Sequence, residues 1–336
     1  MVRSRAKLED VARRAGCGLA TVDRVLNERG GVSPATAQRV LKAARALGLR
    51  RILPAPWHRQ IRIDILLTRS ATPYIGRLNA AFVAIAGTLD RSVTLQRSAL
   101  DPQPTPAARR MAESSADAVA VYVVDHHSVR EAVDRLALRG VPVICLTTDL
   151  PGTARAAYVG IDHGKAGRTA AFLAARVQLA REPGAALVIT TSLAFRAHVE
   201  RVDGFAEGLA RHAPDARIAE VLEAMDDPDR AYAAIRTALA ARDDWGALYN
   251  TGGANRAVAA AIADAGWRDR LIFLGHELTG ETASLLASGA MLATIDQAPE
   301  LQARRATDIL LRRLGLAEGE VPTGEIPFTL HTPENI

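Results

Sequence analysis

The sequence predicts two structural classes within 336 residues: a small all-α helix-turn-helix head, followed by a larger α/β domain of two lobes. Residues 1–49 hold three short amphipathic segments separated by glycines, as in small helical domains. In residues 61–336, apolar runs of strand length alternate with helical segments, which indicates parallel sheets flanked by helices. Residues 50–60 contain Pro54 and Pro56, which disfavour a continuous helix, so we expect a hinge linker there.

Three helices are predicted in the head. The first covers 8–15 and ends at Gly16, and the second covers about 19–27. A third begins at Ser33-Pro34, where serine suits the cap and proline the first helical position, and it runs to about Leu47. Two short helices joined by a turn that contains glycine allow the second to enter the major groove of DNA.

Charge is concentrated in this head. The first 60 residues hold 13 Lys/Arg and 4 Asp/Glu, a net charge of +9, whereas the other 276 hold 29 and 33, a net charge of −4. A basic head on a mildly acidic body indicates a polyanionic partner at the N-terminal end. We therefore expect double-stranded DNA as the partner of the head.

Most candidate DNA contacts lie at the start of the second helix, where outward side chains reach base edges. Arg24 can pair bidentately with guanine or hold a phosphate, and Asn27 can bond to a base or to the backbone. The predicted DNA-binding residues are Leu8, Gly18, Leu19, Ala20, Thr21, Arg24, Asn27 and Trp57. Each chain has one reading helix and useful specificity needs two, so we expect a homodimer or a higher assembly on a pseudo-palindromic site.

The head closely resembles the DNA-binding head of the lactose-repressor (LacI/GalR) family. The matching motifs are Asp10-Val11-Ala12, Ala15-Gly16, Thr21-Val22 and Arg24-Val25-Leu26-Asn27. Gly18 and Asp23 stand where that family carries serines, and the Val-Asp-Arg-Val-Leu-Asn variant resembles one of its branches. The resemblance implies a sequence-specific DNA-binding transcription regulator, acting as a repressor on operator DNA.

The linker departs from that family, in which a short hinge helix places a leucine wedge in the minor groove. The leucine position falls on His58, with Trp57 beside it, and Pro56 would lie inside the helix at a cost of roughly 3 kcal/mol or more. A wedge must be apolar, so Trp57 could serve and His58 poorly. We expect an extended linker or a single turn; the alternative is a slipped alignment in which Leu53 or Trp57 still wedges.

In the body, polar residues follow the predicted strands. The candidate strands are 61–67, 93–97, 118–124, 141–146, 185–190, 246–250 and 271–274, arranged as two half-domains of roughly 61–160 and 161–290 with a late crossover back. The candidate helices lie near 75–89, 104–114, 128–139, 164–179, 199–211, 229–241, 254–265, 280–288 and 299–314. Ligands of parallel sheets bind at the carboxyl ends of the strands.

A polyhydroxyl ligand needs planar hydrogen-bonding groups and an aromatic face. The Arg201 fork can bridge two adjacent hydroxyls or a carboxylate, and Tyr74 could stack on a sugar ring. The predicted effector-binding residues are Tyr74, Asp125, Thr147, Asp149, Arg201, Asn250, Glu277 and Gln297. We therefore expect a small effector, which is a sugar, a polyol or a sugar acid.

The body also resembles the type I periplasmic-binding-protein-like effector domain of the same family. The matching segments are Thr72-Pro73-Tyr74, 162–168, Arg201 to Phe205, 273–278 and 293–297. The alternatives are a solute-binding protein of a transport system or an enzyme on the same fold. The attached basic head disfavours the first alternative.

The sequence offers no catalytic set, so we expect no enzyme activity, cofactor or metal. Asp125-His126-His127 is similar to a metal phosphoesterase signature, but no motif ties a second cluster to it. Ser192 and His198 lack the context of a nucleophile elbow. With only Cys17 and Cys145, an N-terminus without the apolar core of a signal peptide, and no membrane-length apolar run, we expect a cytoplasmic protein with no membrane partner.

Overall fold

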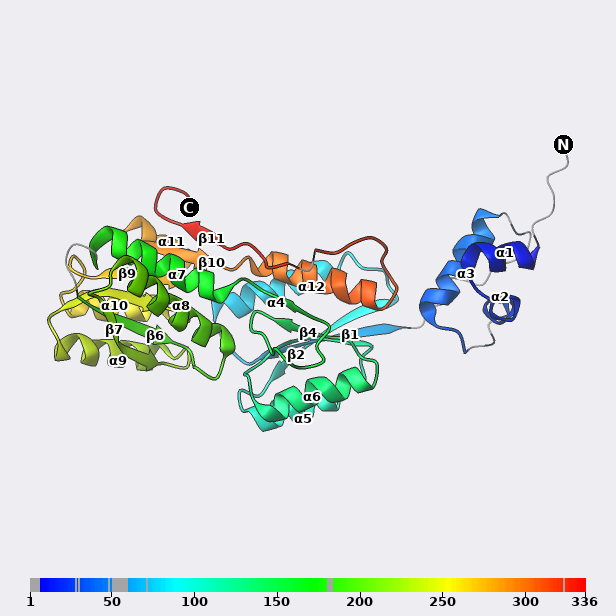
Figure 1. The fold of residues 1–336 in the computed structure, drawn as a ribbon, viewed down its shortest axis with the longest axis horizontal. Coiled ribbons are helices and arrows are strands. Elements are labelled where there is room, and N and C mark those ends of the chain that lie inside the picture. Colours follow the sequence, from blue (N-terminus) through cyan, green and yellow to red (C-terminus); the bar gives the residue numbers. More distant parts are fainter. Residues whose placement is uncertain are drawn as a thin grey trace.

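The computed structural model describes residues 7–27, 29, 31–47, 49, 60–70, 72–179, 184–322 and 324–336 (Figure 1). The head consists of α1 (Leu8–Ala15), α2 (Leu19–Leu26) and α3 (Pro34–Ala46). Val11, Val22 and Val40 are fully buried where the three helices meet, which explains the helical spacing of the apolar residues. α1 ends at Gly16, whose φ of 62° is the left-handed conformation that glycine adopts without strain.

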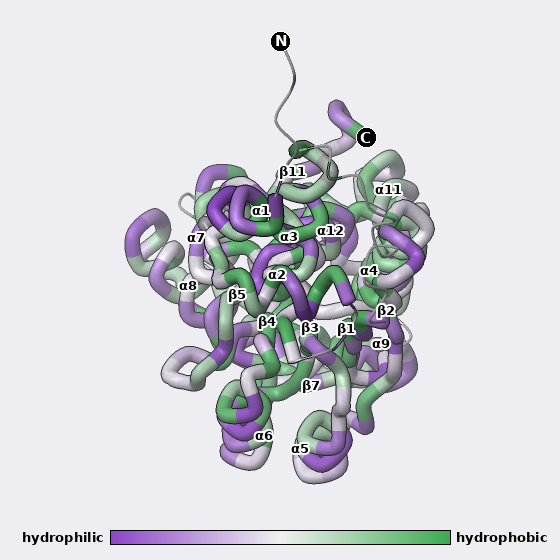
Figure 2. Tube along the Cα trace, turned by 90° about the vertical axis from the view of Figure 1, so that its right-hand side faces the viewer, coloured by the Kyte–Doolittle hydropathy of each residue, from purple (hydrophilic) through white to green (hydrophobic). Residues whose placement is uncertain are grey.

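The first lobe is built on a parallel five-stranded sheet in the order β2-β1-β3-β4-β5. Its elements are β1 (Ile61–Thr68), α4 (Pro73–Ala86), β2 (Val93–Leu100), α5 (Pro104–Ala112), β3 (Ala118–Tyr122), α6 (His127–Leu138), β4 (Val143–Leu146) and β5 (Ala157–Val159). α5 and α6 pack against each other over one face of this sheet. Figure 2 shows the hydrophobic colour in the central strands and the hydrophilic colour on the outer sides of these two helices.

The second lobe has a six-stranded sheet in the order β11-β10-β9-β8-β6-β7, parallel except for the antiparallel pair of β10 and β11. Its strands are β6 (Ala185–Thr190), β7 (Arg217–Glu223), β8 (Trp245–Asn250), β9 (Ile272–His276), β10 (Ala293–Asp296) and β11 (Thr329–His331). Its helices are α7 (His163–Ala174), which continues as a π-helical turn (Ala175–Leu179), α8 (Arg196–His212), α9 (Pro228–Ala241), α10 (Asn255–Asp264) and α11 (Gly280–Ala287).

The last helix, α12 (Pro299–Arg313), crosses back to the first lobe and packs against α4, as the expected late crossover requires (Figure 1). The second lobe extends past the expected limit of 290, because β10 and β11 both belong to its sheet. The sequence prediction missed β5, β7, β10 and β11. β5, β10 and β11 have only three or four residues, and β7 is an edge strand whose residues are partly or fully exposed, so none forms a long apolar run.

Within the described residues, no helix is long and apolar enough to cross a membrane.

One apolar core joins the two lobes on the side of the molecule that carries α4, α12, α7 and α8. α7 and α8 approach closely because glycines line their contact: a Cβ at Gly167 would lie 2.2 Å from the Arg201 carbonyl oxygen. This close contact fixes the start of α8, where Arg201 lies.

Candidate effector cleft and DNA-binding head

A cleft lies where the carboxyl ends of strands from both sheets meet. It is lined by side chains that end or follow β1, β3 and β4 of the first lobe and β6, β7, β8, β9 and β10 of the second. Five of the predicted effector residues line it: Tyr74, Thr147, Arg201, Glu277 and Gln297. The structure therefore brings together residues that are far apart in the sequence, such as Tyr74 and Gln297, which are 223 positions apart.

Three predicted effector residues do not line the cleft. Asp125 pairs with Arg130 at 2.6 Å, and Asp149 pairs with Arg155 on the surface of the same lobe. Asn250 is 1% exposed, and its amide binds the Gly253 carbonyl and Asn255 Oδ1, so it shapes the loop after β8. For these three residues the prediction is corrected, because each side chain is held by a neighbour along the chain.

Arg201 is 3% exposed and lies at the centre of a buried network. Its Nε donates to Nδ1 of His163 at 3.1 Å, and its Nη1 donates to the Thr251 carbonyl at 2.5 Å. Nε2 of His163 in turn lies 2.5 Å from the Thr147 carbonyl of the first lobe. Burial, and next the charge of Arg201, lower the pKa of His163 well below its usual value, so the imidazole stays neutral and accepts from Arg201.

The hydroxyl of Tyr74 is used inside the protein. It bonds to the Thr147 hydroxyl and lies 3.2 Å from Oε1 of Gln302 on α12, which also accepts from Thr147 at 3.0 Å. Burial, and next the charge of Glu277, raise the pKa of Tyr74, so this hydroxyl stays protonated. Tyr74 thus lines the cleft, and its hydroxyl links α4 to α12 through the hydrogen bond to Gln302.

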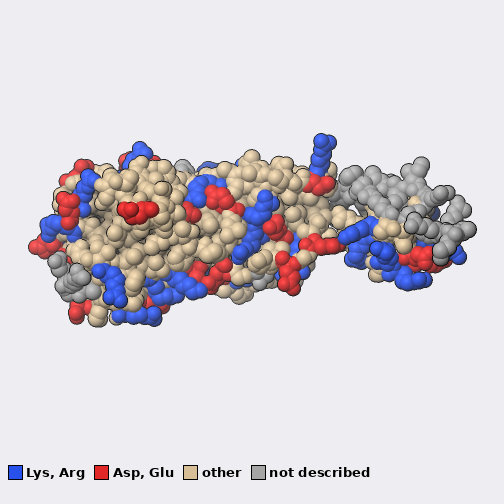
Figure 3. Space-filling view, turned by 90° about the horizontal axis from the view of Figure 1, so that it is seen from above, with Lys and Arg blue, Asp and Glu red and all other residues tan. Residues whose placement is uncertain are grey.

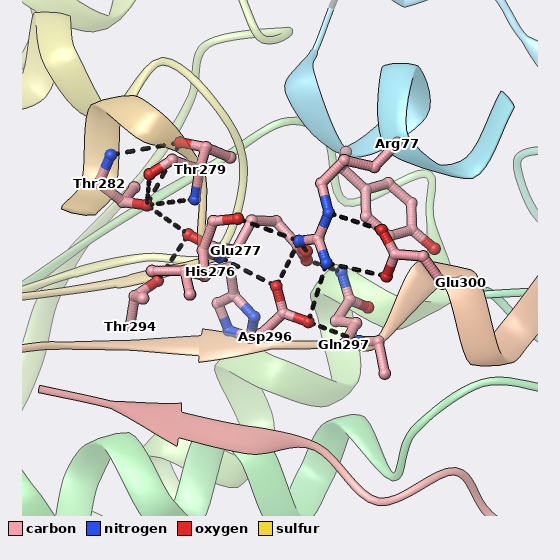
Figure 4. Close-up of polar contacts among 12 residues, drawn as sticks. Arg77, His276, Glu277, Thr279, Thr282, Thr294, Asp296, Gln297 and Glu300 are labelled. Atoms are coloured by element: carbon pink, nitrogen blue, oxygen red, sulfur yellow. Dashed lines mark hydrogen bonds and ion pairs between the residues drawn. The ribbon is translucent and has the colours of Figure 1, made fainter. Parts of the chain in front are cut away.

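Glu277 and Gln297 belong to a second network on the wall of the cleft (Figure 4). Nε2 of Gln297 donates to Oε1 of Glu277, and Arg77 Nη1 lies 3.5 Å from Oε2. Arg77 is itself held by Asp296 and Glu300. Burial, followed by the nearby charge of Asp296, raises the pKa of Glu277 to about 8.

Backbone strain is concentrated in this cleft. Among the described residues, six non-glycine residues have a positive φ, and four of them line the cleft: Thr147, Asp226, Ala254 and Glu277. Such conformations cost about 1–3 kcal/mol each and persist where surrounding contacts impose them. Their clustering supports a binding role for these strand ends.

Sequence reasoning missed several lining residues, namely Tyr122, Thr191, Asp226, Thr251, Asn255 and His276. Tyr122 and His276 end β3 and β9, and Thr251 follows β8, so the strand-end rule could have found them. Asp226 follows β7, which the prediction lacked. Within the described residues, no group of three or more His, Cys, Asp or Glu side chains could hold a metal ion.

In the head, α2 presents the predicted reading surface. Gly18 is its N-cap and supplies no side-chain cap, Leu19 is 46% exposed, and Ala20 and Arg24 are exposed. Leu8, Thr21 and Asn27 are half-buried, and Trp57 lies outside the described residues. Figure 3 shows Lys and Arg side chains gathered on the described part of the head.

Asp23 is bound within the head. It accepts from Nδ2 of Asn27 at 2.6 Å and from Nη1 of Arg29 at 3.0 Å. Its charge is thereby partly neutralised on the helix that is expected to approach DNA.

Two families of known proteins match different parts of the chain. Residues 63–318 match the family described as "Periplasmic binding protein domain", and residues 7–51 match "Bacterial regulatory proteins, lacI family". The predicted fold class, a helical head with a type I periplasmic-binding-protein-like domain, is confirmed. No curated protein matches the sequence.

Several solved structures share the fold of the body. A solute-binding protein of an ABC transporter from Burkholderia graminis, in complex with D-arabinose, has a TM-score of 0.74 and 21% identity over 83% of this chain and 97% of that chain. The Caulobacter myo-inositol binding protein has a TM-score of 0.73 and 21% identity, over 85% and 97%. GanP, a glucose-galactose binding protein from Geobacillus stearothermophilus, has a TM-score of 0.72 and 20% identity, over 82% and 98%.

Proposed function

Because the chain belongs to the family of periplasmic binding protein domains over residues 63–318 and carries a lacI-family segment over 7–51, we propose that it is a transcription regulator. It binds operator DNA through its head, and a small sugar-like effector in the cleft controls that binding. We propose that the protein represses transcription. We also propose that it lies in the cytoplasm, where the DNA is. The observation that carries the proposal is the presence of both modules in one chain.

The proposed DNA contacts are those of the exposed face of α2. Leu19, Ala20 and Thr21 lie at its start, and Arg24 projects one turn further on. The N-terminal residues of a reading helix contact base edges in the major groove. Leu8, Gly18 and Asn27 complete the proposed set, and Trp57 remains a candidate in the linker.

The proposed effector contacts are Tyr74, Thr147, Arg201, Glu277 and Gln297. Buried polar groups around a small cavity favour a ligand with many hydroxyls, because an unmatched buried group is costly. The neighbours that share the fold include proteins described as binding D-arabinose, myo-inositol, glucose and galactose. We propose a sugar or a polyol as the effector class.

The assembly is proposed to be a homodimer, since one α2 per chain reads one half-site. The division into a head over 1–49, a linker over 50–60 and an effector and dimerisation domain over 61–336 is part of the same proposal. A solute-binding protein of a transport system is the second candidate, favoured by the transport-related neighbours and disfavoured by the head.

The test is selection of a binding site from random duplex DNA with the full-length protein, followed by gel-shift titration. We expect a pseudo-palindromic site, an affinity that falls steeply with salt, and a loss of about 1–3 kcal/mol of specific binding in Arg24→Ala. Lys42→Ala, on the exposed outer side of α3, is the control and should keep the sequence preference. Failure to select any sequence would contradict the proposal and favour the solute-binding alternative.

A further inference from the structure

The charges that line the cleft are predominantly negative. Among the described lining residues, Asp226 and Glu281 carry carboxylates and Arg201 carries the single guanidinium, while the raised pKa of Glu277, about 8, keeps its carboxyl mostly protonated near neutral pH. The two lining imidazoles add no positive charge near neutral pH. Burial, with Arg201 as the next cause, lowers the pKa of His198 to about 3 and lowers that of His276 well below its usual value.

Two of the five N–H groups of the Arg201 guanidinium are bonded within the protein. Its Nε donates to His163 and its Nη1 donates to the Thr251 carbonyl. An anionic ligand is recognised best by a guanidinium that offers two free parallel N–H groups. Nε of Arg201 is not available for such a pair, so only the remaining N–H groups of Nη1 and Nη2 can bind a ligand, and their single positive charge stands against the two carboxylates Asp226 and Glu281.

Asp226, in contrast, lines the cleft with one carboxylate oxygen available to a ligand. Its Oδ1 accepts from the Thr191 hydroxyl at 2.5 Å and from the Gly253 amide at 2.9 Å, which leaves Oδ2 for a further donor. Glycine is needed at 252, because a Cβ there would lie 2.5 Å from the Thr191 hydroxyl and 2.8 Å from the Thr191 backbone nitrogen, and a Cβ at Gly253 would crowd Asp226 Oδ1 at 3.0 Å. The Gly252-Gly253 pair thus has a role in holding this carboxylate.

The turn that carries Asp226 is strained. Met225 and Asp226 have φ values of 56° and 57°, two consecutive non-glycine residues in the left-handed region. Strain of this kind persists where contacts impose it, and here those contacts aim a carboxylate at the cleft.

Two further buried oxygens on lining residues lack a hydrogen-bond partner. These are Oε1 of Gln297, which is an acceptor, and Oε2 of Glu277, which carries the proton of that carboxyl near neutral pH because Oε1 accepts from Gln297. The nearest cation to Glu277 is Arg77, whose guanidinium is already bonded to Asp296 and Glu300. The cleft therefore holds an unmatched acceptor at Gln297 and two carboxylates, Asp226 and Glu281, against the one charge of Arg201, and it favours a ligand that brings donors and positive charge.

We propose that the effector carries a protonated amine, as an amino sugar does, and that Asp226 is the residue that recognises it. This inference rests on the proposed function, since it concerns the same cleft. In the partly buried cleft one added positive charge near Asp226 should tighten binding roughly tenfold relative to the neutral parent. A sugar acid should bind more weakly than either.

The experiment compares matched ligands by calorimetry on the full-length protein at pH 6.5. The two series are D-glucosamine, D-glucose and D-glucuronate, and D-galactosamine, D-galactose and D-galacturonate. The amine should bind roughly tenfold tighter than its neutral parent. Asp226→Asn should abolish that difference, and Glu281→Gln should reduce it by less. Glu131→Gln, an exposed acid on α6 away from the cleft, is the matched control and should retain the preference.

A second arm removes the dependence on sugar stereochemistry. Ethanolamine, ethylene glycol and glycolate are compared by thermal shift at millimolar concentration on the same variants. An ethanolamine shift that disappears in Asp226→Asn supports the inference even if no sugar binds, in which case only the sugar class of the proposed function fails. The inference is overturned if neutral or anionic ligands bind as tightly as the amines, if the preference survives in a folded Asp226→Asn, or if no compound of either set binds.

Discussion

The two lobes use the ends of their strands differently. In the first lobe, the acids that follow β3 and β4, Asp125 and Asp149, are paired with Arg130 and Arg155, and the cleft receives aromatic rings and hydroxyls instead. In the second lobe, Arg201 and Asp226 face the cleft with their charges, and the carboxyl of Glu277 lies beside them. A strand end thus places a residue near a site, but the neighbouring side chains decide whether its charge is free for a ligand.

The two lobes therefore supply different kinds of contact to the ligand. The first lobe supplies a face of rings and hydroxyls, in which Tyr74 and Thr147 are fixed by Gln302. The second lobe supplies the charge-assisted contacts, which are the stronger ones. Changes in the second lobe should therefore alter effector affinity far more than changes at equivalent places in the first.

The largest effect is expected for Arg201→Met. Removing the guanidinium leaves His163 and the Thr251 carbonyl without their donor and deprives the ligand of a charged partner. We expect effector affinity to fall about 100-fold. Calorimetry with the best-binding sugar of the panel measures it, and Arg130→Met in the first lobe is the control. Equal losses in the two variants would remove the distinction between the lobes.

A smaller effect, visible as a pH dependence, is expected for Glu277→Gln. In the folded protein the pKa of Glu277 is raised to about 8, above the pKa of the same carboxyl in the unfolded chain. Between these two pKa values the folded state holds a proton that the unfolded state has released. The wild type should therefore lose stability as the pH rises from about 5 to 8, by up to about 1.4 kcal/mol per pH unit. The free energy of unfolding of Glu277→Gln should not fall in this way, because its amide does not titrate.

Urea unfolding of both proteins across this range is the measurement, with Glu131→Gln as the baseline for an exposed acid. The gap between Glu277→Gln and the wild type should widen with pH. Parallel stability curves would show that Glu277 is not held protonated in the empty cleft.

Tyr74→Phe tests the first lobe. Its hydroxyl bonds to Thr147 and Gln302 inside the protein, so its removal should cost about 1 kcal/mol of unfolding free energy and change effector affinity less than about threefold. The control is Tyr232→Phe, whose hydroxyl bonds to Asp264 on the exposed surface. A loss of effector affinity without a loss of stability would mean that the Tyr74 hydroxyl contacts the ligand.

The smallest effect is expected for Asp149→Asn. Because its carboxylate is held by Arg155 away from the cleft, effector affinity should stay within about twofold of the wild type. A tenfold loss in calorimetry would place Asp149 in the site and contradict the division between the lobes.

The sequence predicted what depends on long apolar patterns. The three head helices and the strands β1, β3, β6, β8 and β9 follow from periodicity and from continuous apolar runs. The edge strand β7 was missed because its exposed residues interrupt the apolar run, and Asp226, which follows it, was missed for the same reason. Asp125 and Asp149 were placed in the site because sequence spacing does not reveal which arginine will pair with them.

The central claim is that the cleft controls the DNA-binding head. Its most direct test is the affinity of the full-length protein for its selected operator, measured by fluorescence anisotropy with and without a saturating effector. We predict that the effector changes the operator affinity of the wild type about tenfold or more, as coupling of 1–3 kcal/mol implies, and leaves that of Arg201→Met unchanged. The same operator affinity with and without bound effector in the wild type would contradict the account.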